Sequence, residues 1–213
     1  MAKITGVITG WKGKVGNMVF AMWKGVQVVK TRTVPTNPQS TGQIAQRGVF
    51  GDIVSIFKTI ASGFIRSFWN PFVTQFQSGW GNFLSANLLA MGNSFDITKA
   101  IMAQGSLDGV TIATCTYDDG TGEVEITWNT SNPVNGEQTD VASVVVYNED
   151  TREVVFASTE GDSRADEAST VTIATGLTAT DLHAFLIFST ENPSSGEITA
   201  CSDSQYHAVA AAT

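Results

Sequence analysis

The amino-acid sequence predicts an α+β protein in which an N-terminal β-hairpin and long helices precede an all-β sandwich. Three patterns indicate this order. A basic, Gly-rich segment with strand-like runs precedes residue 35, two aromatic stripes with helical spacing occupy residues 44–91, and seven short alternating segments follow residue 110. The helices therefore lie between two β regions along the chain.

Residues 3–34 predict, in order, a strand, a loop, a strand, a tight turn and a strand. Lys12–Asn17 is the expected loop, and Lys24-Gly25 closes a hairpin between Met18–Trp23 and Val26–Val34. Lys14 lacks the following Ser or Thr that a phosphate-binding loop needs, so we expect a tight turn there instead. Three short strands are marginal alone, so this sheet must pack on the helices or on another subunit.

A long helix is predicted from Ser40 to Trp69. Pro38 keeps the preceding residue extended, and Ser40 with Gln43 has the spacing of a capping box. The apolar positions recur in steps of three and four, as one buried helix face requires: Ile44, Phe50, Ile53, Val54, Phe57, Ile60, Ala61, Phe64, Ile65 and Phe68. Asn70-Pro71 ends or kinks this helix. A second stripe predicts a second helix: Phe72, Phe76, Trp80, Phe83, Leu84, Leu88 and Met91.

The remaining chain is a succession of short strands separated by turn residues. The expected strands are Val110–Tyr117, Glu123–Trp128, Val141–Tyr147, Glu153–Ser158, Thr170–Thr175, Leu182–Ser189 and Ile198–His207. Seven strands in about 100 residues are typical of an immunoglobulin-like or fibronectin-like sandwich. Trp128, Tyr147 and Phe156 are its expected core residues.

Charge divides the chain in two. Residues 1–105 hold ten Lys or Arg and two acids, a balance of +8, whereas residues 106–213 hold two Arg and eighteen acids, a balance of −16. Thirteen of the twenty Phe, Trp and Tyr also lie in the first part. With loop residues at Gly105–Gly109, these shifts predict a basic, aromatic-rich assembly domain at 1–105 and an acidic sandwich at 106–213.

No signal peptide is expected, because the first ten residues lack a continuous apolar run. No run of apolar residues is long enough for a transmembrane helix. We therefore expect no membrane partner.

The sequence contains no convincing catalytic, metal or cofactor motif. The only histidines, His183 and His207, lack a nucleophile-elbow motif and are expected at the sandwich surface or edge. Asp118, Asp119 and Glu123 carry oxygen ligands that suit Ca²⁺, but their spacing fits no EF-hand and favours a solvated hairpin turn. We expect no enzyme activity, no metal and no cofactor.

Cys115 and Cys201 both lie in strand-like segments of the second part. A disulfide would form if they faced each other across neighbouring strands. The alternative is two buried free thiols that behave as small apolar residues, which is the expectation unless the compartment is oxidising.

Several segments together resemble a domain family that Bacteroidota and their tailed phages encode and that has no assigned activity. They are the Gly13–Asn17 segment of GKxGN form, the Gly25–Lys30 strand, Asn37–Ser40 with Gln43, Gln46 and Arg47 in a pattern similar to NPxTxxQxxQR, and the Ser202–Tyr206 ending. Ser40 replaces the usual threonine and keeps the hydroxyl. The resemblance implies a virion structural protein: a head-decoration, head-fibre or tail-associated protein.

The expected function is thus a non-enzymatic structural component of a phage virion, made in the host cytoplasm. The N-terminal part would form a homo-oligomer or bind capsid or tail proteins, and the sandwich would project. The residues expected to contact partners are Trp11, Lys14, Asn17, Trp23, Asn37, Pro38, Gln43, Gln46, Arg47, Phe50, Phe57 and Phe64. Two alternatives remain open: a nucleic-acid-binding protein that uses the basic part, with Trp11 and Trp23 for stacking, and a bacterial surface module that binds carbohydrate.

Overall fold

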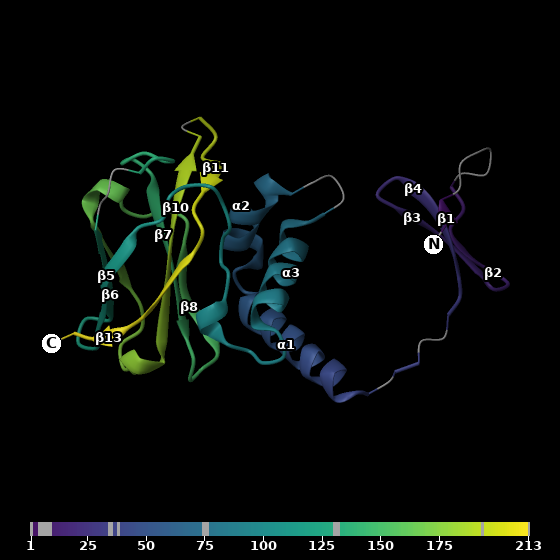
Figure 1. Cartoon of the computed structure of the whole chain (residues 1–213), viewed down its shortest axis with the longest axis horizontal. Coiled ribbons are helices and arrows are strands. Elements are labelled where there is room, and N and C mark those ends of the chain that lie inside the picture. Colours follow the sequence, from purple (N-terminus) through teal and green to yellow (C-terminus); the bar gives the residue numbers. More distant parts are fainter. Residues whose placement is uncertain are drawn as a thin grey trace. The chain divides into compact units, whose positions relative to one another are not determined.

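The chain forms two compact units, Met1–Ser40 and Thr41–Thr213 (Figure 1). The computed structural model describes residues 2–3, 10–33, 36–37, 39–73, 77–129, 133–192 and 194–212. The helices and the sandwich share the larger unit, so the division of the chain falls after Ser40 and not near Gly105–Gly109. The charge shift at residue 105 marks a change of layer within that unit.

The smaller unit is an antiparallel sheet with the strand order β1-β4-β3-β2. Its strands are β1 (Ala2–Lys3), β2 (Gly13–Val15), β3 (Met18–Trp23) and β4 (Val26–Thr31). The predicted turn at Lys24-Gly25 is confirmed, and both residues have the positive φ that a two-residue hairpin turn of type I′ requires. The predicted loop at Lys12–Asn17 is partly wrong, because Gly13–Val15 pairs with β3 as a strand.

The larger unit contains the two predicted sheets of the sandwich. The central sheet has the order β11-β10-β7-β8 with β12 also paired to β10, and the outer sheet has the order β13-β5-β6-β9. The strands are β5 (Thr111–Asp118), β6 (Glu123–Asn129), β7 (Val141–Asn148), β8 (Glu153–Ser158), β9 (Ala168–Thr172), β10 (Leu182–Glu191), β11 (Ile198–Cys201), β12 (Gln205–Ala208) and β13 (Ala210–Ala211). All seven predicted strands are present, and the last is split into β11 and β12.

The predicted long helix is interrupted. The helical elements are α1 (Thr41–Phe57), the π-helical turn η1 (Ala61–Ile65), α2 (Arg66–Trp69), the 3₁₀ turn η2 (Asn70–Phe72) and α3 (Gly79–Met91). The chain bends by 96° between α1 and the segment Ala61–Phe72. Ser78 accepts a hydrogen bond from the Gly81 amide and caps α3, which therefore begins later than the apolar stripe predicted. Three further 3₁₀ turns are η3 (Ile97–Lys99), η4 (Arg164–Asp166) and η5 (Ala179–Asp181).

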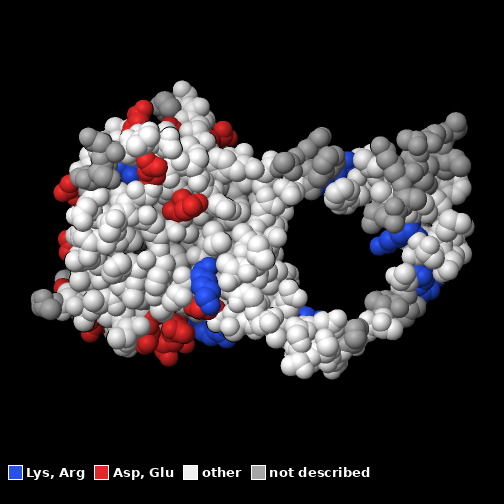
Figure 2. Space-filling view, viewed as in Figure 1, with Lys and Arg blue, Asp and Glu red and all other residues white. Residues whose placement is uncertain are grey.

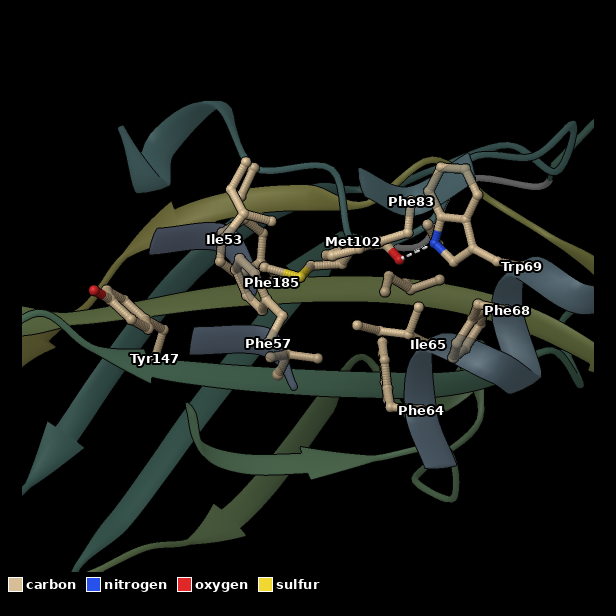
Figure 3. Packing of buried hydrophobic residues seen from close by; sticks show 14 of the residues in the cluster. Ile53, Phe57, Phe64, Ile65, Phe68, Trp69, Phe83, Met102, Tyr147 and Phe185 are labelled. Carbon is tan, nitrogen blue, oxygen red and sulfur yellow. Dashed lines mark hydrogen bonds between the residues drawn. The ribbon is translucent and has the colours of Figure 1, made fainter. Parts of the chain in front are cut away.

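The helices cover the outward face of the central sheet, so this sheet is buried on both sides (Figure 1). One core lies between helices and sheet, where Phe57, Phe64 and Phe83 meet Tyr147 and Phe185 (Figure 3). Trp69 closes this core and donates a 2.8 Å hydrogen bond from its indole nitrogen to the Met102 carbonyl. The larger unit is therefore a three-layer structure of helices, central sheet and outer sheet.

The second core lies between the two sheets. Trp128 is buried there as predicted, packs edge-on against Phe188 and donates to the Arg164 carbonyl. Tyr147 is also buried as predicted, but it belongs to the core on the helical side. Phe156 is partly buried against the core between the sheets.

Candidate assembly surface

Strand pairing in the smaller unit assigns its side chains to two faces, because directly opposed residues of an antiparallel pair lie on the same side of a sheet. Val15 pairs with Met18, Phe20 with Val29, and Met22 with Gln27. We call the side that carries these residues the uncharged face: Val15, Met18, Phe20, Met22, Gln27, Val29 and Thr31. The opposite side is the basic face: Lys14, Val19, Ala21, Trp23, Val26, Val28 and Lys30.

Trp11 folds over the uncharged face. Its ring lies 5.8 Å from that of Phe20, and its carbonyl accepts a 2.6 Å hydrogen bond from the Gln27 side-chain nitrogen. The Gln27 side-chain oxygen accepts in turn from the Gly10 amide at 2.9 Å, and Gln27 is buried. The Gln27 side-chain amide on this face is thus already hydrogen-bonded. The apolar side chains beside it are not covered to the same degree, since Trp11 is 53% exposed and Met18 is 54% exposed.

The basic face is also apolar between its cations. Ala21, Trp23, Val28 and Lys30 of this face line a hollow of about 310 Å³, and Met22, which lies between Ala21 and Trp23 in β3, also borders it. Lys24 lies over the Trp23 ring at 5.9 Å, within the range of a cation–π contact. This hollow offers an indole wall and an ammonium group to a partner.

The charge of the smaller unit has one sign. Its forty residues hold six Lys or Arg and no acid, so the net charge of the unit is +6 and that of the rest of the chain is −14. In Figure 2 the blue residues of the unit have no red neighbours of their own, and the red residues gather over the sandwich. Electrostatics alone therefore favours an anionic partner for the basic face.

The first turns of α1 form a second exposed surface, on the larger unit. Gln43, Gln46 and Arg47 are exposed, and Phe50 is 45% exposed beside them. Thr41–Gly48 has only Ala45 partly covered. These four predicted residues thus lie on one accessible helical segment.

Two predicted contact residues are corrected. Phe57 and Phe64 belong to the core between the helices and the central sheet, where a partner does not reach them. The helical spacing of these residues predicts one apolar stripe, but it does not show whether a sheet of the same chain or a second subunit covers that stripe. Asn17 lies in the β2–β3 turn, where its carbonyl accepts from the Arg32 amide, and Asn37 is exposed. Pro38 lies outside the described residues.

His183 is not a surface residue, contrary to the prediction. It is 8% exposed, and its ring nitrogens lie 2.9 Å from the Tyr206 hydroxyl and 3.1 Å from a Glu149 carboxylate oxygen. Burial is the main cause that raises the pKa of Tyr206. This chain of hydrogen bonds joins the turn after β7 to β12. His207 is partly buried, and one of its ring nitrogens lies 2.7 Å from the Ala208 carbonyl oxygen.

The two cysteines are free thiols, so the second alternative from the sequence is confirmed. Cys115 lies in the core between the sheets and Cys201 in the core under the helices, with the central sheet between the two cores. Burial raises the pKa of Cys115 to about 12 and that of Cys201 to about 11. Neither thiol is in a state that favours nucleophilic chemistry.

The part of the chain that the structure describes contains no group of three His, Cys, Asp or Glu side chains arranged to hold a metal ion. Asp118 accepts from the Gly120 amide within the β5–β6 turn. No single described helix is long and apolar enough to cross a membrane. The helices from Thr41 to Phe72 reach the length and apolar composition of a membrane span only when they are taken together, and they are bent relative to each other. Their apolar side is buried on the central sheet.

Two hollows flank Arg66 on the larger unit. One, of about 650 Å³, is lined by Lys58, Arg66 and Trp80 among others, and the other, of about 520 Å³, shares Arg66 and Asn70 with it. The larger hollow has cations and neutral polar groups in its wall but no carboxylate.

Comparison with known proteins gives a family but no function. No curated protein and no solved structure matches the chain. One family model matches residues 10–202, which span most of the chain and parts of both structural units. The chain therefore belongs to DUF6266, a family of unknown function.

Proposed function

We propose that the protein is a non-enzymatic structural component of a phage particle. The N-terminal unit acts as the assembly module, and the acidic sandwich, braced by its helical layer, is the projecting part. The observation that carries the proposal is the surface of the N-terminal unit, where large apolar side chains are exposed on both faces of a small sheet.

A sheet of this size is only marginally stable when no other layer packs against it. Two-layer packing normally stabilises a sheet of this size, yet Trp11, Met18 and Trp23 are each more than half exposed. A unit of forty residues buries little surface on folding. A partner that covers one or both faces supplies the missing layer, which is the expected behaviour of an assembly module.

The larger unit fits the projecting role. Its apolar surface is used internally by two cores, and residues 106–213 carry −16. A strong net charge of one sign keeps neighbouring modules apart in a crowded array. The similarity of Gly13–Asn17 and Asn37–Arg47 to segments of phage-encoded proteins supports placing this array on a virion.

The proposal is tested on particles. Purified particles of a phage that encodes this chain are washed in high salt, and their proteins are quantified by peptide mass spectrometry. We expect the protein at a fixed copy number relative to the major capsid protein. If it is absent from washed particles but present in the lysate, the virion role is refuted.

Light scattering on the full chain tests the assembly module separately. An oligomer that persists at high salt indicates association through apolar surface, whereas salt-sensitive association indicates electrostatic contact. A matched fragment, residues 41–213, lacks the N-terminal unit and is expected to be monomeric under both conditions.

A nucleic-acid-binding function is the second candidate, and the basic face favours it. Lys14 and Lys30 lie on either side of Val19 on that face. Exposed Trp23 lies on the same face with Lys24 over its ring, and this combination of cations and a stacking ring suits single-stranded nucleic acid. Affinity for an oligonucleotide should then fall linearly with salt on logarithmic axes, and Trp23→Ala should weaken it. No binding at low salt would rule this function out.

A further inference from the structure

Within the proposed function, on which this inference rests, we infer that the uncharged face of the N-terminal sheet is an interface with the same face of a second copy. The two sheets stack as the halves of a small sandwich, and the two basic faces point outward. The resulting dimer is the unit that the acidic modules extend from.

The placement of charge selects this face for a second copy. Lys14 and Lys30 both lie on the basic face, and Lys24 lies in the β3–β4 turn. Stacked sheets are roughly 10 Å apart, so contact through the basic faces would bring like charges of two +6 units into one apolar interface. Contact through the uncharged faces keeps these ammonium groups on opposite outer sides of the dimer.

Charge also decides against other occupants of this face. Nucleic acid needs cations at the contact, and the uncharged face has none among its described strand residues. The acidic sandwich of another molecule would likewise leave its carboxylates unpaired there. Both of these partners are complementary to the basic face instead.

The exposed area suits a modest homodimer. Trp11, Val15, Met18 and Met22 are each about half exposed on this face. Together they present roughly 400 Å² per copy, about half of what each partner buries in a standard interface. Phe20 and Val29 are partly exposed and enlarge the patch. The expected dimer therefore dissociates on dilution instead of being permanent.

The relief of the face is compatible with twofold symmetry. Trp11 stands above Phe20, while both residues of the neighbouring pair Val15 and Met18 are more than half exposed. A twofold axis that places Trp11 of each copy on the Val15–Met18 pair of the other covers both exposed pairs at once. Such mutual contacts define an isologous interface.

The test compares two residues of equal exposure on opposite faces of one strand. Met18 and Trp23 are 54% and 53% exposed, and both belong to β3. The full-length variants Met18→Lys and Trp23→Lys are studied by analytical ultracentrifugation from low to high micromolar concentration. We expect Met18→Lys to raise the dimer Kd by about 100-fold, because it buries two ammonium groups in one interface, and Trp23→Lys to leave it unchanged.

Crosslinking keeps the inference testable if a lysine variant fails to fold. Positions 18 and 23 are both exposed, whereas native Cys115 and Cys201 are buried. In the variants Met18→Cys and Trp23→Cys, a short bis-maleimide therefore reacts at the introduced thiol. Met18→Cys should give a covalent dimer and Trp23→Cys should not.

The outcomes separate this inference from the proposed function. If the wild-type chain is an oligomer that Met18→Lys leaves intact, or if only Trp23→Cys crosslinks, the face assignment is refuted while the assembly role stands. A wild-type chain that stays monomeric at high concentration refutes the second copy as occupant. The virion role is then decided by the particle measurement alone.

Discussion

Removal of the helical layer should unfold the sandwich, although the net charge of the chain changes sign between these two layers. The fragment 41–213 contains the helices and both sheets, and the fragment 106–213 contains the sheets alone. In the second fragment the helical side of the central sheet faces water. The apolar residues exposed by this deletion are Val145, Tyr147, Phe185, Ile187, Ile198 and Cys201.

The magnitude follows from the burial of these six residues, none of which is more than 5% exposed in the larger unit. Full burial stabilises a large apolar side chain by about 1.5–3 kcal/mol, so the five larger ones together contribute roughly 8–15 kcal/mol. A domain of this size is stable by only about 5–15 kcal/mol in total. The loss is therefore as large as the whole free energy of unfolding.

Guanidinium unfolding followed by tryptophan fluorescence and near-UV circular dichroism measures the difference. We expect 41–213 to be monomeric and to unfold cooperatively, and 106–213 to aggregate or to lose its near-UV signal. The reasoning would be refuted by a monomeric 106–213 fragment whose free energy of unfolding lies within about 2 kcal/mol of that of 41–213.

Three further predictions concern individual side chains. Arg164→Met should destabilise the larger unit by about 3–5 kcal/mol and lower its Tm by roughly 10 °C, because Asp140 then loses the cation of a fully buried ion pair. The double variant Arg164→Met with Asp140→Asn should recover part of this lost stability. Iodoacetamide should label Cys115 and Cys201 only after unfolding, because burial raises the pKa of both thiols and leaves about one thiolate in a thousand, or fewer, at pH 8. Hydrogen bonds from the Asn135 and Val134 amides lower the pKa of Asp108, so its stabilising contribution is present above the unfolded value of 3.8 and is lost as pH falls through the lower folded value. The difference in Tm between wild type and Asp108→Asn should accordingly disappear as the solution is acidified.

The strands of the sandwich could be predicted from sequence because their signals are local. In β6 every second residue, such as Val124 and Ile126, is buried, and turn residues bound each strand. The Lys24-Gly25 turn was equally predictable, since glycine and a two-residue spacing specify the hairpin. These features depend on residues within a few positions of one another.

The layer arrangement was missed because its signal lies in the contrast between strands. The run Val144–Val146 in β7 and the run Phe185–Phe188 in β10 are apolar without alternation, as expected of strands buried on both faces. Against the alternating β6, these runs indicate that something covers the central sheet. The change in net charge at residue 105 instead suggested two separate domains, because net charge depends on the solvent-facing residues of each layer and not on which layers pack together.

The sequence predicts Trp11, Lys14 and Trp23 as contact residues, and the structure shows that all three are exposed. Their division between two faces required the strand register. Lys14 and Val15 are adjacent in sequence yet lie on opposite sides of the sheet. Only the pairing of β2 with β3 shows which of them accompanies Met18. The buried His183 was likewise beyond prediction, since Glu149 and Tyr206 approach it from distant parts of the chain.

The position of the helical layer has a consequence for synthesis on the ribosome. Residues 41–105 emerge before the sandwich, and the sheet that covers their aromatic side is complete only when β10 and β12 have been made, about a hundred residues later. At elongation rates of about 5–20 residues per second, Phe57, Phe64 and Phe83 remain without their partners for roughly 5–20 s. Nascent chains of this protein should therefore be good clients for chaperones that bind exposed aromatic segments near the ribosomal exit.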